Sequence, residues 1–488
     1  MKKLLLFILF PTILFSQIQI GENILGESSE DYSGYSISLS SDGTILAIGA
    51  PYNNALYNNN SNSGHVRIYK NNNGVWEQIG SDIDGESPAD YSGNSVSVSS
   101  NGNIIAIGAS SATHHDSNRN ISGHVRIYEN NSGIWEQIGS DINGESSGDN
   151  SGYSVSLSSD GKVVAIGAPD NSDLFNNSGH VRIYENNSGI WEQIGSDING
   201  ESSGDNSGYS VSLSSDGKVV AIGAPKNNSQ SQSGRVRIYK NNNEVWEQIG
   251  SDIDGELPGD LSGTSVSLSY NGNIIAIGTP KNNSQSQSGR VRIYKNNNEV
   301  WEQIGSDIDG ELPGDLSGTS VSLSSNGNII AIGAPNNKGS FGQVRIYENN
   351  NGVWQQSGND IESETAGNFL GSSVSLSPNG KIVAIGSLVS DLNGIDSGHV
   401  EVYDLSTVLT TDNNLISDFK IYPNPASEEV ILYLNDLNLK EVSIFNKLGQ
   451  LVKVSKTKTI NTSILKSGIY FLQIETDLGI GIKKLVIE

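Results

Sequence analysis

The chain has 488 residues, a net charge of −25 and no cysteine. The lack of cysteine excludes disulfides, thiol catalysis and zinc sites built from Cys ligands. An acidic chain argues against nucleic acid and anionic membranes as partners, and it suits either cation binding or simple solubility. Residues 417–488 carry nine Lys and eight Asp or Glu, so almost all of the negative charge lies upstream of them.

The chain begins with Met-Lys-Lys, and residues 4–15 form a mostly apolar run. This run is too short to span a bilayer and is typical of a secretory signal peptide. We predict cleavage after Ser16, which makes Gln17 the first mature residue. A buried N-terminal strand is the alternative interpretation. No other stretch has the length and apolarity of a transmembrane helix, so we expect no transmembrane segment.

The central part of the chain is repetitive. Ala-Ile-Gly recurs seven times at spacings of 53–59 residues, and a Val-Arg-Ile-Tyr core or its variant follows each copy. Alternating and continuous apolar runs predict four short strands per unit, at residues 35–40, 45–49, 65–69 and 75–80 in the first copy. One such unit cannot build a core alone, whereas a stack can. The sequence therefore predicts an all-β, seven-bladed β-propeller.

The last unit lacks the string Trp-Glu-Gln-Ile-Gly-Ser-Asp-Ile, which occurs five times upstream and once more in altered form at residues 354–361. Residues 17–28 align with residues 76–87 without a gap, so the mature N-terminus supplies the missing fourth strand. A first strand that completes the last blade closes the ring and removes its exposed edges. The predicted domains are a signal peptide (1–16), a propeller (17–405), a linker (406–416) and a C-terminal segment (417–488).

Five units carry an arginine in the third strand and a glutamate in the fourth, of which Arg67 and Glu77 are the first pair. The other pairs are Arg126 and Glu136, Arg182 and Glu192, Arg237 and Glu247, and Arg292 and Glu302. In the last unit Glu401 replaces the arginine and Ile18 replaces the glutamate, which avoids a like-charge pair. We interpret these residues as structural cross-strand pairs.

The repeat pattern Ser-Gly-x-Ser-Val-Ser-Leu-Ser, then Ala-Ile-Gly-Ala-Pro, then Gly-x-Val-Arg-Ile-Tyr resembles FG-GAP-type repeats. Such repeats build the seven-bladed propeller of integrin α subunits and of many secreted bacterial proteins. The resemblance covers residues 17–405. It implies the fold more than an activity, because a propeller hosts many functions.

Integrin-type blades often carry an Asp-x-Asp-x-Asp-Gly calcium loop, and this chain has no such run. The nearest acidic elements supply the following calcium candidates: Asp82, Asp84, Glu86, Asp90, Asp254 and Asp309. Calcium takes six to eight oxygen ligands, some of which these loops could offer. The alternative is that the acidic side chains bond local backbone N–H groups. No other cofactor is expected.

The sequence contains no familiar catalytic or nucleotide-binding motif. One strand position holds His65, His124, His180 and His399 in four units and Arg235, Arg290 and Gln343 in the others, so it tolerates exchange. A second group, His114, His115 and Asp116, falls in a variable loop that is either a metal site or simply solvated. Residues 226–280 and 281–335 differ at only two positions. Catalysis needs unlike groups at one point, so we expect no enzyme.

The loops between the second and third strands differ most between units and are rich in Asn, Ser and Gln. In a propeller they share a face with the connectors between units, and such loops often carry binding residues. The alternative is neutral drift in solvated loops.

Residues 417–488 have short alternating strands, which predict a small β-sandwich. The notable residues are Tyr422, Pro423, Asn424, Pro425, Gly449, Gly468, Tyr470, Lys483 and Lys484. These motifs resemble the type A sorting domain of the type IX secretion system. The resemblance implies passage through the periplasm and outer membrane with the secretion machinery as partner, then removal of the domain, often with attachment to surface lipopolysaccharide. Without the resemblance, the segment is an accessory β-domain on a linker.

Together these patterns predict a secreted or cell-surface propeller that binds a glycan or protein ligand for adhesion or recognition and catalyses nothing. Two alternatives stay open. One is a polysaccharide-directed enzyme that uses carboxylates in the central channel. The other is a structural spacer at the cell surface.

Overall fold

The computed structural model describes residues 17–487 except 55–61, 112–121, 227–231, 282–286, 410–418, 435–437, 447–450, 464 and 477–478. The predicted signal peptide with Ser16, the loop with His114, His115 and Asp116, and Gly449 lie outside the described residues. The described chain is all-β, as predicted. Its one helix, α1 (Asn337–Ser340), is a single turn interrupted by left-handed backbone at Lys338 and Gly339.

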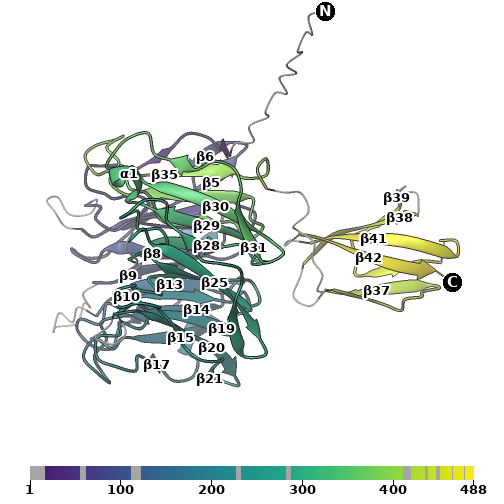
Figure 1. Cartoon of the computed structure of the whole chain (residues 1–488), viewed down its shortest axis with the longest axis horizontal. Helices are drawn as coiled ribbons and strands as arrows, with labels where there is room; N and C mark the ends of the chain where they lie inside the picture. Colours follow the sequence, from purple (N-terminus) through teal and green to yellow (C-terminus); the bar gives the residue numbers. More distant parts are fainter. Residues whose placement is uncertain are drawn as a thin grey trace, which may run out of the picture.

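Seven similar antiparallel sheets lie between residues 18 and 404 (Figure 1). Their first strands are β3 (Ser36–Leu39), β8 (Ser92–Val98), β13 (Ser154–Leu157), β18 (Ser210–Leu213), β23 (Ser265–Leu268), β28 (Ser320–Leu323) and β33 (Leu370–Leu376). The second strands are β4 (Ile45–Ala50), β9 (Ile104–Ala109), β14 (Val163–Ala168), β19 (Val219–Ala224), β24 (Ile274–Thr279), β29 (Ile329–Ala334) and β34 (Ile382–Ser387). The third strands are β5 (His65–Asn72), β10 (His124–Asn131), β15 (His180–Asn187), β20 (Arg235–Asn242), β25 (Arg290–Asn297), β30 (Gln343–Asn350) and β35 (His399–Asp404).

Two more strands pair with each third strand. The fourth strands are β6 (Val75–Gln78), β11 (Ile134–Gln137), β16 (Ile190–Gln193), β21 (Val245–Gln248), β26 (Val300–Gln303), β31 (Val353–Gln356) and β1 (Ile18–Gln19). The short fifth strands are β7 (Ile83–Asp84), β12 (Ile142–Asn143), β17 (Ile198–Asn199), β22 (Ile253–Asp254), β27 (Ile308–Asp309), β32 (Ile361–Glu362) and β2 (Ile24–Leu25).

The sequence pattern explains the burial of these strands. The first strand alternates, so Ile37 and Leu39 are buried while Ser36 and Ser38 are half-buried. The second strand is apolar throughout because both of its faces are covered, and Leu46 is fully buried. Each core cluster mixes residues of two neighbouring sheets, so no sheet forms a core by itself.

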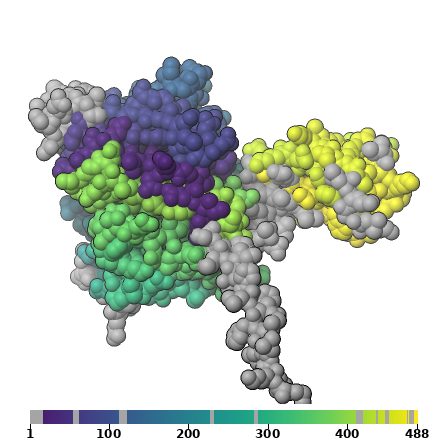
Figure 2. All heavy atoms as spheres, turned by 90° about the horizontal axis from the view of Figure 1, so that it is seen from above, coloured from purple at the N-terminus to yellow at the C-terminus, as the bar shows by residue number. Residues whose placement is uncertain are grey.

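The N-terminal strands belong to the last sheet. β1 and β2 pair antiparallel with β35, with Ile18 opposite Asp404 and Ile24 opposite Val400. Figure 2 shows the purple N-terminal residues lying against the light-green residues of this sheet. The two ends of the repeat region therefore share one hydrogen-bonded sheet.

Neighbouring sheets contact each other in chain order, and the last contacts the first. The Val98 N–H donates to Ser38 Oγ at 3.0 Å, and the equivalent bond from the Leu39 N–H to Ser375 Oγ, also 3.0 Å, joins the first sheet to the seventh. One hollow of about 160 Å³ has an apolar side chain from every sheet in its lining, namely Leu39, Val98, Leu157, Leu213, Leu268, Leu323 and Leu376. The seven first strands therefore meet around one small hollow.

The C-terminal segment has its own core and lies apart from the seven sheets in Figure 1. One sheet contains β36 (Lys420–Tyr422), β37 (Glu429–Tyr433) and β40 (Thr459–Asn461), and the other contains β38 (Leu439–Asn446), β39 (Leu451–Ser455), β41 (Gly468–Thr476) and β42 (Gly479–Ile487). Val430 of the first sheet and Leu472 of the second are both fully buried in this core. In the described part of the chain, no helix has the length and apolarity needed to cross a membrane.

Candidate functional site

The repeated tryptophan joins neighbouring sheets. Trp76 Nε1 donates to the Ile20 carbonyl at 2.9 Å. Five more tryptophans make the same bond to the preceding sheet at 2.9–3.0 Å: Trp135, Trp191, Trp246, Trp301 and Trp354. At the seventh junction Gln17 stands in the tryptophan's place, and its Nε2 donates to the Asn359 carbonyl at 2.6 Å. The repeated string is therefore a structural link between sheets, and its last copy is completed by the predicted first mature residue.

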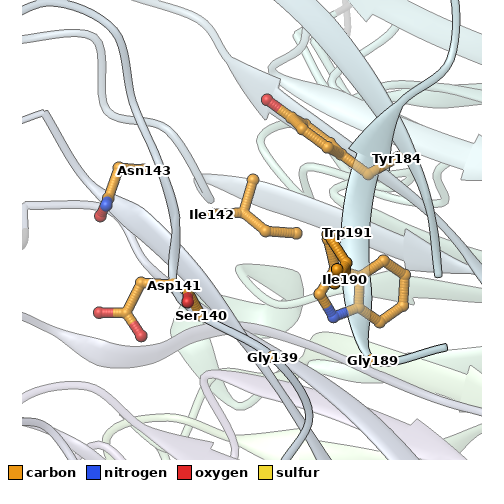
Figure 3. Close-up of a pocket in the computed structure, with 9 residues that line it drawn as sticks. All are labelled: Gly139, Ser140, Asp141, Ile142, Asn143, Tyr184, Gly189, Ile190 and Trp191. Carbon is orange, nitrogen blue, oxygen red and sulfur yellow. The ribbon is translucent and has the colours of Figure 1, made fainter. Parts of the chain in front are cut away.

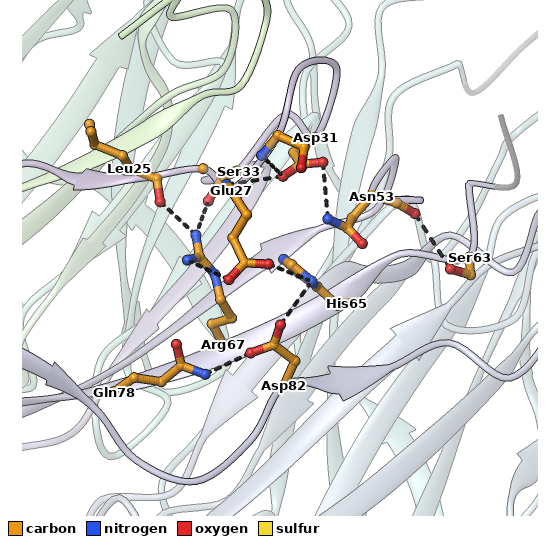
Figure 4. A network of polar contacts seen from close by, with 12 residues as sticks. Leu25, Glu27, Asp31, Ser33, Asn53, Ser63, His65, Arg67, Gln78 and Asp82 are labelled. Atoms are coloured by element: carbon orange, nitrogen blue, oxygen red, sulfur yellow. Dashed lines mark hydrogen bonds and ion pairs between the residues drawn. The ribbon is translucent and has the colours of Figure 1, made fainter. Parts of the chain in front are cut away.

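The strand arginines have other partners than the sequence suggests (Figure 4). Glu77 lies opposite Lys70, whereas Arg67 Nη1 is 3.5 Å from Glu27 Oε1 and its Nη2 donates to the Leu25 carbonyl at 2.7 Å. Equivalent arginine–glutamate pairs are Arg126 with Glu86, Arg182 with Glu145, Arg237 with Glu201, Arg292 with Glu256 and Arg345 with Glu311. The predicted cross-strand pairing is wrong, because the long guanidinium side chain reaches the connector that precedes its own sheet.

The seventh sheet was predicted to avoid a pair of like charges, because Ile18 stands where five other sheets have a glutamate. The structure places the relevant glutamate elsewhere. Glu364 stands at the connector position of Glu27, so the seventh sheet keeps a carboxylate there while Glu401 replaces the arginine. Glu401 accepts a hydrogen bond from the Tyr403 hydroxyl at 2.7 Å and lies 2.9 Å from His399 Nε2. Burial, followed by the charge of Glu401, raises the pKa of Tyr403.

The acidic connector residues mostly hold local groups. Asp90 accepts the N–H groups of Glu86 and Ser87 at 2.9 and 2.7 Å, which is the backbone-bonding alternative that the sequence left open. Burial raises the pKa of Asp84, and the charge of Asp82 adds to the rise.

The later calcium candidates lie beside arginines. Asp254 is 3.7 Å from Arg235 Nε, and Asp309 is 3.5 Å from Arg290 Nε. Among the described residues, two groups of three side chains bring potential metal ligands within 4.8 Å of one another, and Asp82 is the one calcium candidate that belongs to either. Calcium binding stays a prediction.

Asp82 faces a buried histidine (Figure 4). His65 is fully buried, and its Nδ1 lies 3.5 Å from Asp82 Oδ2 and 4.0 Å from Glu27 Oε2. Burial lowers the pKa of His65 to about 4, and the charge of Arg67 adds to the effect. The imidazole is therefore neutral at neutral pH.

Six half-buried tyrosines gather where loops and connectors meet, and we call them the tyrosine cluster. Its members are Tyr32, Tyr35, Tyr52, Tyr91, Tyr153 and Tyr209. The ring centroid of Tyr52 lies 5.0 Å from that of Tyr32 and 5.2 Å from that of Tyr91. The ring centroids of Tyr153 and Tyr209 are 4.9 Å apart. Burial raises the pKa of Tyr35 to about 12, and the nearby Tyr52 and Tyr209 contribute. The cluster therefore joins tyrosines of several sheets.

The sequence contains a signal for this cluster in the pattern of its repeats. Tyr35, Tyr153 and Tyr209 precede the first strand of their units at one aligned position, where Thr264 and Thr319 stand in later units. The loops and connectors meet here as predicted, because Asn53 Nδ2 of the first loop donates to Asp31 Oδ1 of the first connector at 3.0 Å.

A second hollow, of about 290 Å³, lies between the outer strands of two sheets (Figure 3). Tyr184, Ile190 and Trp191 form one wall, and Asp141 and Asn143 of the preceding connector are on the other side. Its lining combines the rings of Tyr184 and Trp191 with the polar side chains of Asp141 and Asn143.

The sorting residues tie the start of the C-terminal segment to its last strand. Asn424 Nδ2 donates to the Lys484 carbonyl at 2.8 Å, and the Val486 N–H donates to Asn424 Oδ1 at 2.9 Å. Pro423 and Pro425 flank Asn424, and Tyr422 is exposed at the end of β36.

Three further sorting residues lie on the last two strands. The Tyr470 hydroxyl donates to the Lys466 carbonyl at 2.9 Å, Gly468 begins β41, and Lys483 Nζ lies 5.2 Å from the Phe419 ring centroid.

Comparisons with known proteins identify this segment. Residues 420–488 match the family of secretion system C-terminal sorting domains. No curated protein matches the chain. Among solved structures, the chain is similar to a protein from Bacteroides uniformis provisionally assigned as a 6-phosphogluconolactonase, with 14% identity and a TM-score of 0.47 over 68% of this chain and 87% of that one.

The expectation that the chain is not an enzyme is contradicted by this similarity, because the matched structure bears the name of an enzyme. The exclusion of enzymes is therefore withdrawn. The likeness still assigns no activity to the chain, because its TM-score is too low for that. The match to the sorting family does confirm the predicted export to the cell surface or the extracellular space. Residues 420–488 are a C-terminal sorting domain of the type IX secretion system, and the protein is exported to the cell surface or the extracellular space.

Proposed function

We propose that residues 17–405 form a closed seven-bladed β-propeller of the FG-GAP type, which binds an extracellular glycan through the tyrosine cluster. The pairing of β1 and β2 with β35 supports closure, as do the Leu39–Ser375 bond and the hollow shared by all seven first strands. Export of the chain by its sorting domain places such a surface where extracellular polymers are found.

The tyrosine cluster is the observation that carries the proposal. An aromatic ring has a negative face that attracts the partly positive C–H groups of a sugar ring, and its hydroxyl can bond sugar hydroxyls. Polar groups lie at hand, because the Tyr32 hydroxyl donates to Asp396 at 3.3 Å and Asn62 Nδ2 donates to the Tyr91 hydroxyl at 3.4 Å. Rigid half-exposed tyrosines with polar neighbours are typical of recognition surfaces.

The cluster also breaks the sevenfold repetition. Near-identical units would offer like groups around a ring, whereas Thr264 and Thr319 give two later units a small side chain at the position that aligns with Tyr35. We infer one oriented site on the side of the tyrosines instead of seven equivalent ones.

The test is a glycan array probed with the purified protein, followed by titration calorimetry with the best ligand. We expect Tyr52→Ala and Tyr153→Ala each to weaken binding at least about tenfold, which corresponds to about 1.4 kcal/mol. Tyr433→Ala is the matched control, because Tyr433 is an exposed tyrosine of the sorting domain. An array without enrichment, or equal affinity in all three variants, would contradict the proposal.

A further inference from the structure

The first residue of the third strand is the starting point. In the fourth and fifth sheets this residue is Arg235 and Arg290, and in the first and third sheets it is His65 and His180. The surrounding carboxylates are the same in all four sheets, because each connector repeats the same glutamate and aspartate. The four sites therefore differ in whether an arginine or a histidine lies among equivalent carboxylates.

The two arginines show how a positively charged side chain fits between these carboxylates. Arg235 Nη1 lies 2.8 Å from Asp252 Oδ2 and also bonds Glu201 Oε2. Arg290 repeats the arrangement with Asp307 at 2.8 Å and with Glu256. A single positive charge thus bridges two carboxylates that come from connectors on either side of the strand.

The histidines make no such close contacts. His65 Nδ1 is 3.5 Å from Asp82 Oδ2 and 4.0 Å from Glu27 Oε2. His180 Nδ1 is 3.9 Å from Asp197 Oδ2 and 4.0 Å from Glu145 Oε2. These separations exceed a hydrogen bond. Neither ring nitrogen of His65 or of His180 has a hydrogen-bond partner, although both side chains are almost completely buried. Two carboxylates thus face an unpartnered imidazole where the fourth and fifth sheets place an arginine.

The separations suit two ligands of one metal ion. Ligand atoms about 2.1 Å from a tetrahedral ion are about 3.4 Å from each other, close to the His65–Asp82 distance. Each carboxylate also has its second oxygen held, since Glu27 Oε1 lies 3.5 Å from Arg67 and Asp82 Oδ1 accepts Gln78 Nε2 at 2.6 Å. Such supporting contacts orient ligands toward a metal.

The third sheet repeats the arrangement and adds a ligand. Asp173, from the loop before β15, joins Glu145 and His180 in a group whose ligand atoms lie within 4.8 Å of one another. Its Oδ1 accepts Ser146 Oγ at 3.2 Å and its Oδ2 accepts Asn171 Nδ2 at 3.1 Å, which fixes the carboxylate. Asp197, the counterpart of Asp82, lies 3.9 Å from His180 Nδ1, so Asp173 stands beside this site in addition to the connector aspartate.

We propose that the groups Glu27–His65–Asp82 and Glu145–Asp173–His180 each bind one Zn²⁺ ion. One imidazole nitrogen with carboxylate oxygens is a ligand set for zinc rather than for calcium, which prefers oxygen alone. The side chains of Glu27 and Asp82 are 42% and 24% exposed, so the ion has a path from solvent and an open position for water or a ligand. The inference is independent of the proposed glycan binding.

The test measures bound zinc in the purified protein, prepared without a histidine tag, after equilibrium dialysis against ZnCl₂. His65→Arg and His180→Arg place at each site the residue that the fourth and fifth sheets already hold there, so these variants should fold. We expect each substitution to lower bound zinc by one equivalent and the double variant to lower it by two. Zinc should raise the Tm of the wild type more than that of the double variant.

Two results would overturn the proposal. One is a wild-type protein that binds no zinc under these conditions. The other is a double variant that folds, as circular dichroism would show, and still binds as much zinc as the wild type.

Discussion

The seventh sheet has the same strand arrangement as the other six, but its outer strands come from another part of the chain. In the first six sheets one continuous stretch of chain supplies all the strands, whereas the seventh borrows its outer strands from the N-terminus. A tryptophan links each of the other junctions, and Gln17 links this one. The comparison teaches that the geometry of the junction is kept while its side chains are exchanged.

Removing the borrowed strands is the most drastic way to test the comparison. Deletion of residues 17–25 would strip β1 and β2 from β35 and expose the buried face of Val400 and Val402. We expect the free energy of unfolding to fall by more than about 5 kcal/mol, since the burial of Ile24 alone is worth about 2 kcal/mol. Urea unfolding followed by circular dichroism measures the loss.

The control for this deletion is Ile18→Thr. Ile18 is 54% exposed, so its substitution should change stability by less than about 0.5 kcal/mol. A deletion variant as stable as this control would show that the N-terminal strands are not part of the seventh sheet.

The two kinds of junction should differ in the strength of their links. Trp354→Ala removes a large partly buried ring and its bond to the Ile304 carbonyl, and we expect a loss of about 3 kcal/mol. Gln17→Ala removes the amide bond to Asn359 and should cost about 1 kcal/mol. Equal losses, read from the same unfolding curves, would mean that the seventh junction is linked in some other way.

The replacement of the strand arginine by Glu401 should change how stability depends on pH under alkaline conditions. The pKa of Tyr403 is raised by burial and by Glu401, while at Tyr347 the charge of Arg345 offsets part of the rise due to burial. A tyrosine whose pKa is raised on folding contributes stability that is complete below its unfolded pKa of about 10 and is lost at higher pH.

Tyr403→Phe should therefore reduce the loss of stability between about pH 10 and 12 more than Tyr347→Phe does. Thermal unfolding across this range measures both variants. A larger effect at Tyr347 would contradict the assigned electrostatic difference between the two sheets.

The sequence predicted the strand order and the sorting domain because both leave a signal along the chain. The gap-free alignment of residues 17–28 with 76–87 predicts the pairing of β1 with β35 that the structure shows. The partner of Arg67 was missed because it lies in the connector that precedes its own sheet, and a register within one unit cannot show it.

The candidate sites were harder to foresee for the same reason. Tyr35 and Tyr209 belong to the first and fourth sheets, and their separation along the sequence gives no hint that they lie near each other. The alternation of histidine and arginine at one strand position was readable, but the two carboxylates that face it come from separate connectors.

The central claim is that the N-terminal strand completes the seventh sheet, and a disulfide tests it most directly. The chain has no cysteine, and Ile18 lies opposite Asp404 in the ladder of β1 with β35. Directly opposite positions of a hydrogen-bonded antiparallel pair have Cα atoms about 5.5 Å apart, within the range that a disulfide spans. We predict that the variant Ile18→Cys with Asp404→Cys forms this bond on mild oxidation, as mass spectrometry of the unreduced protein would show. Two free thiols in the folded, oxidised protein would contradict the account.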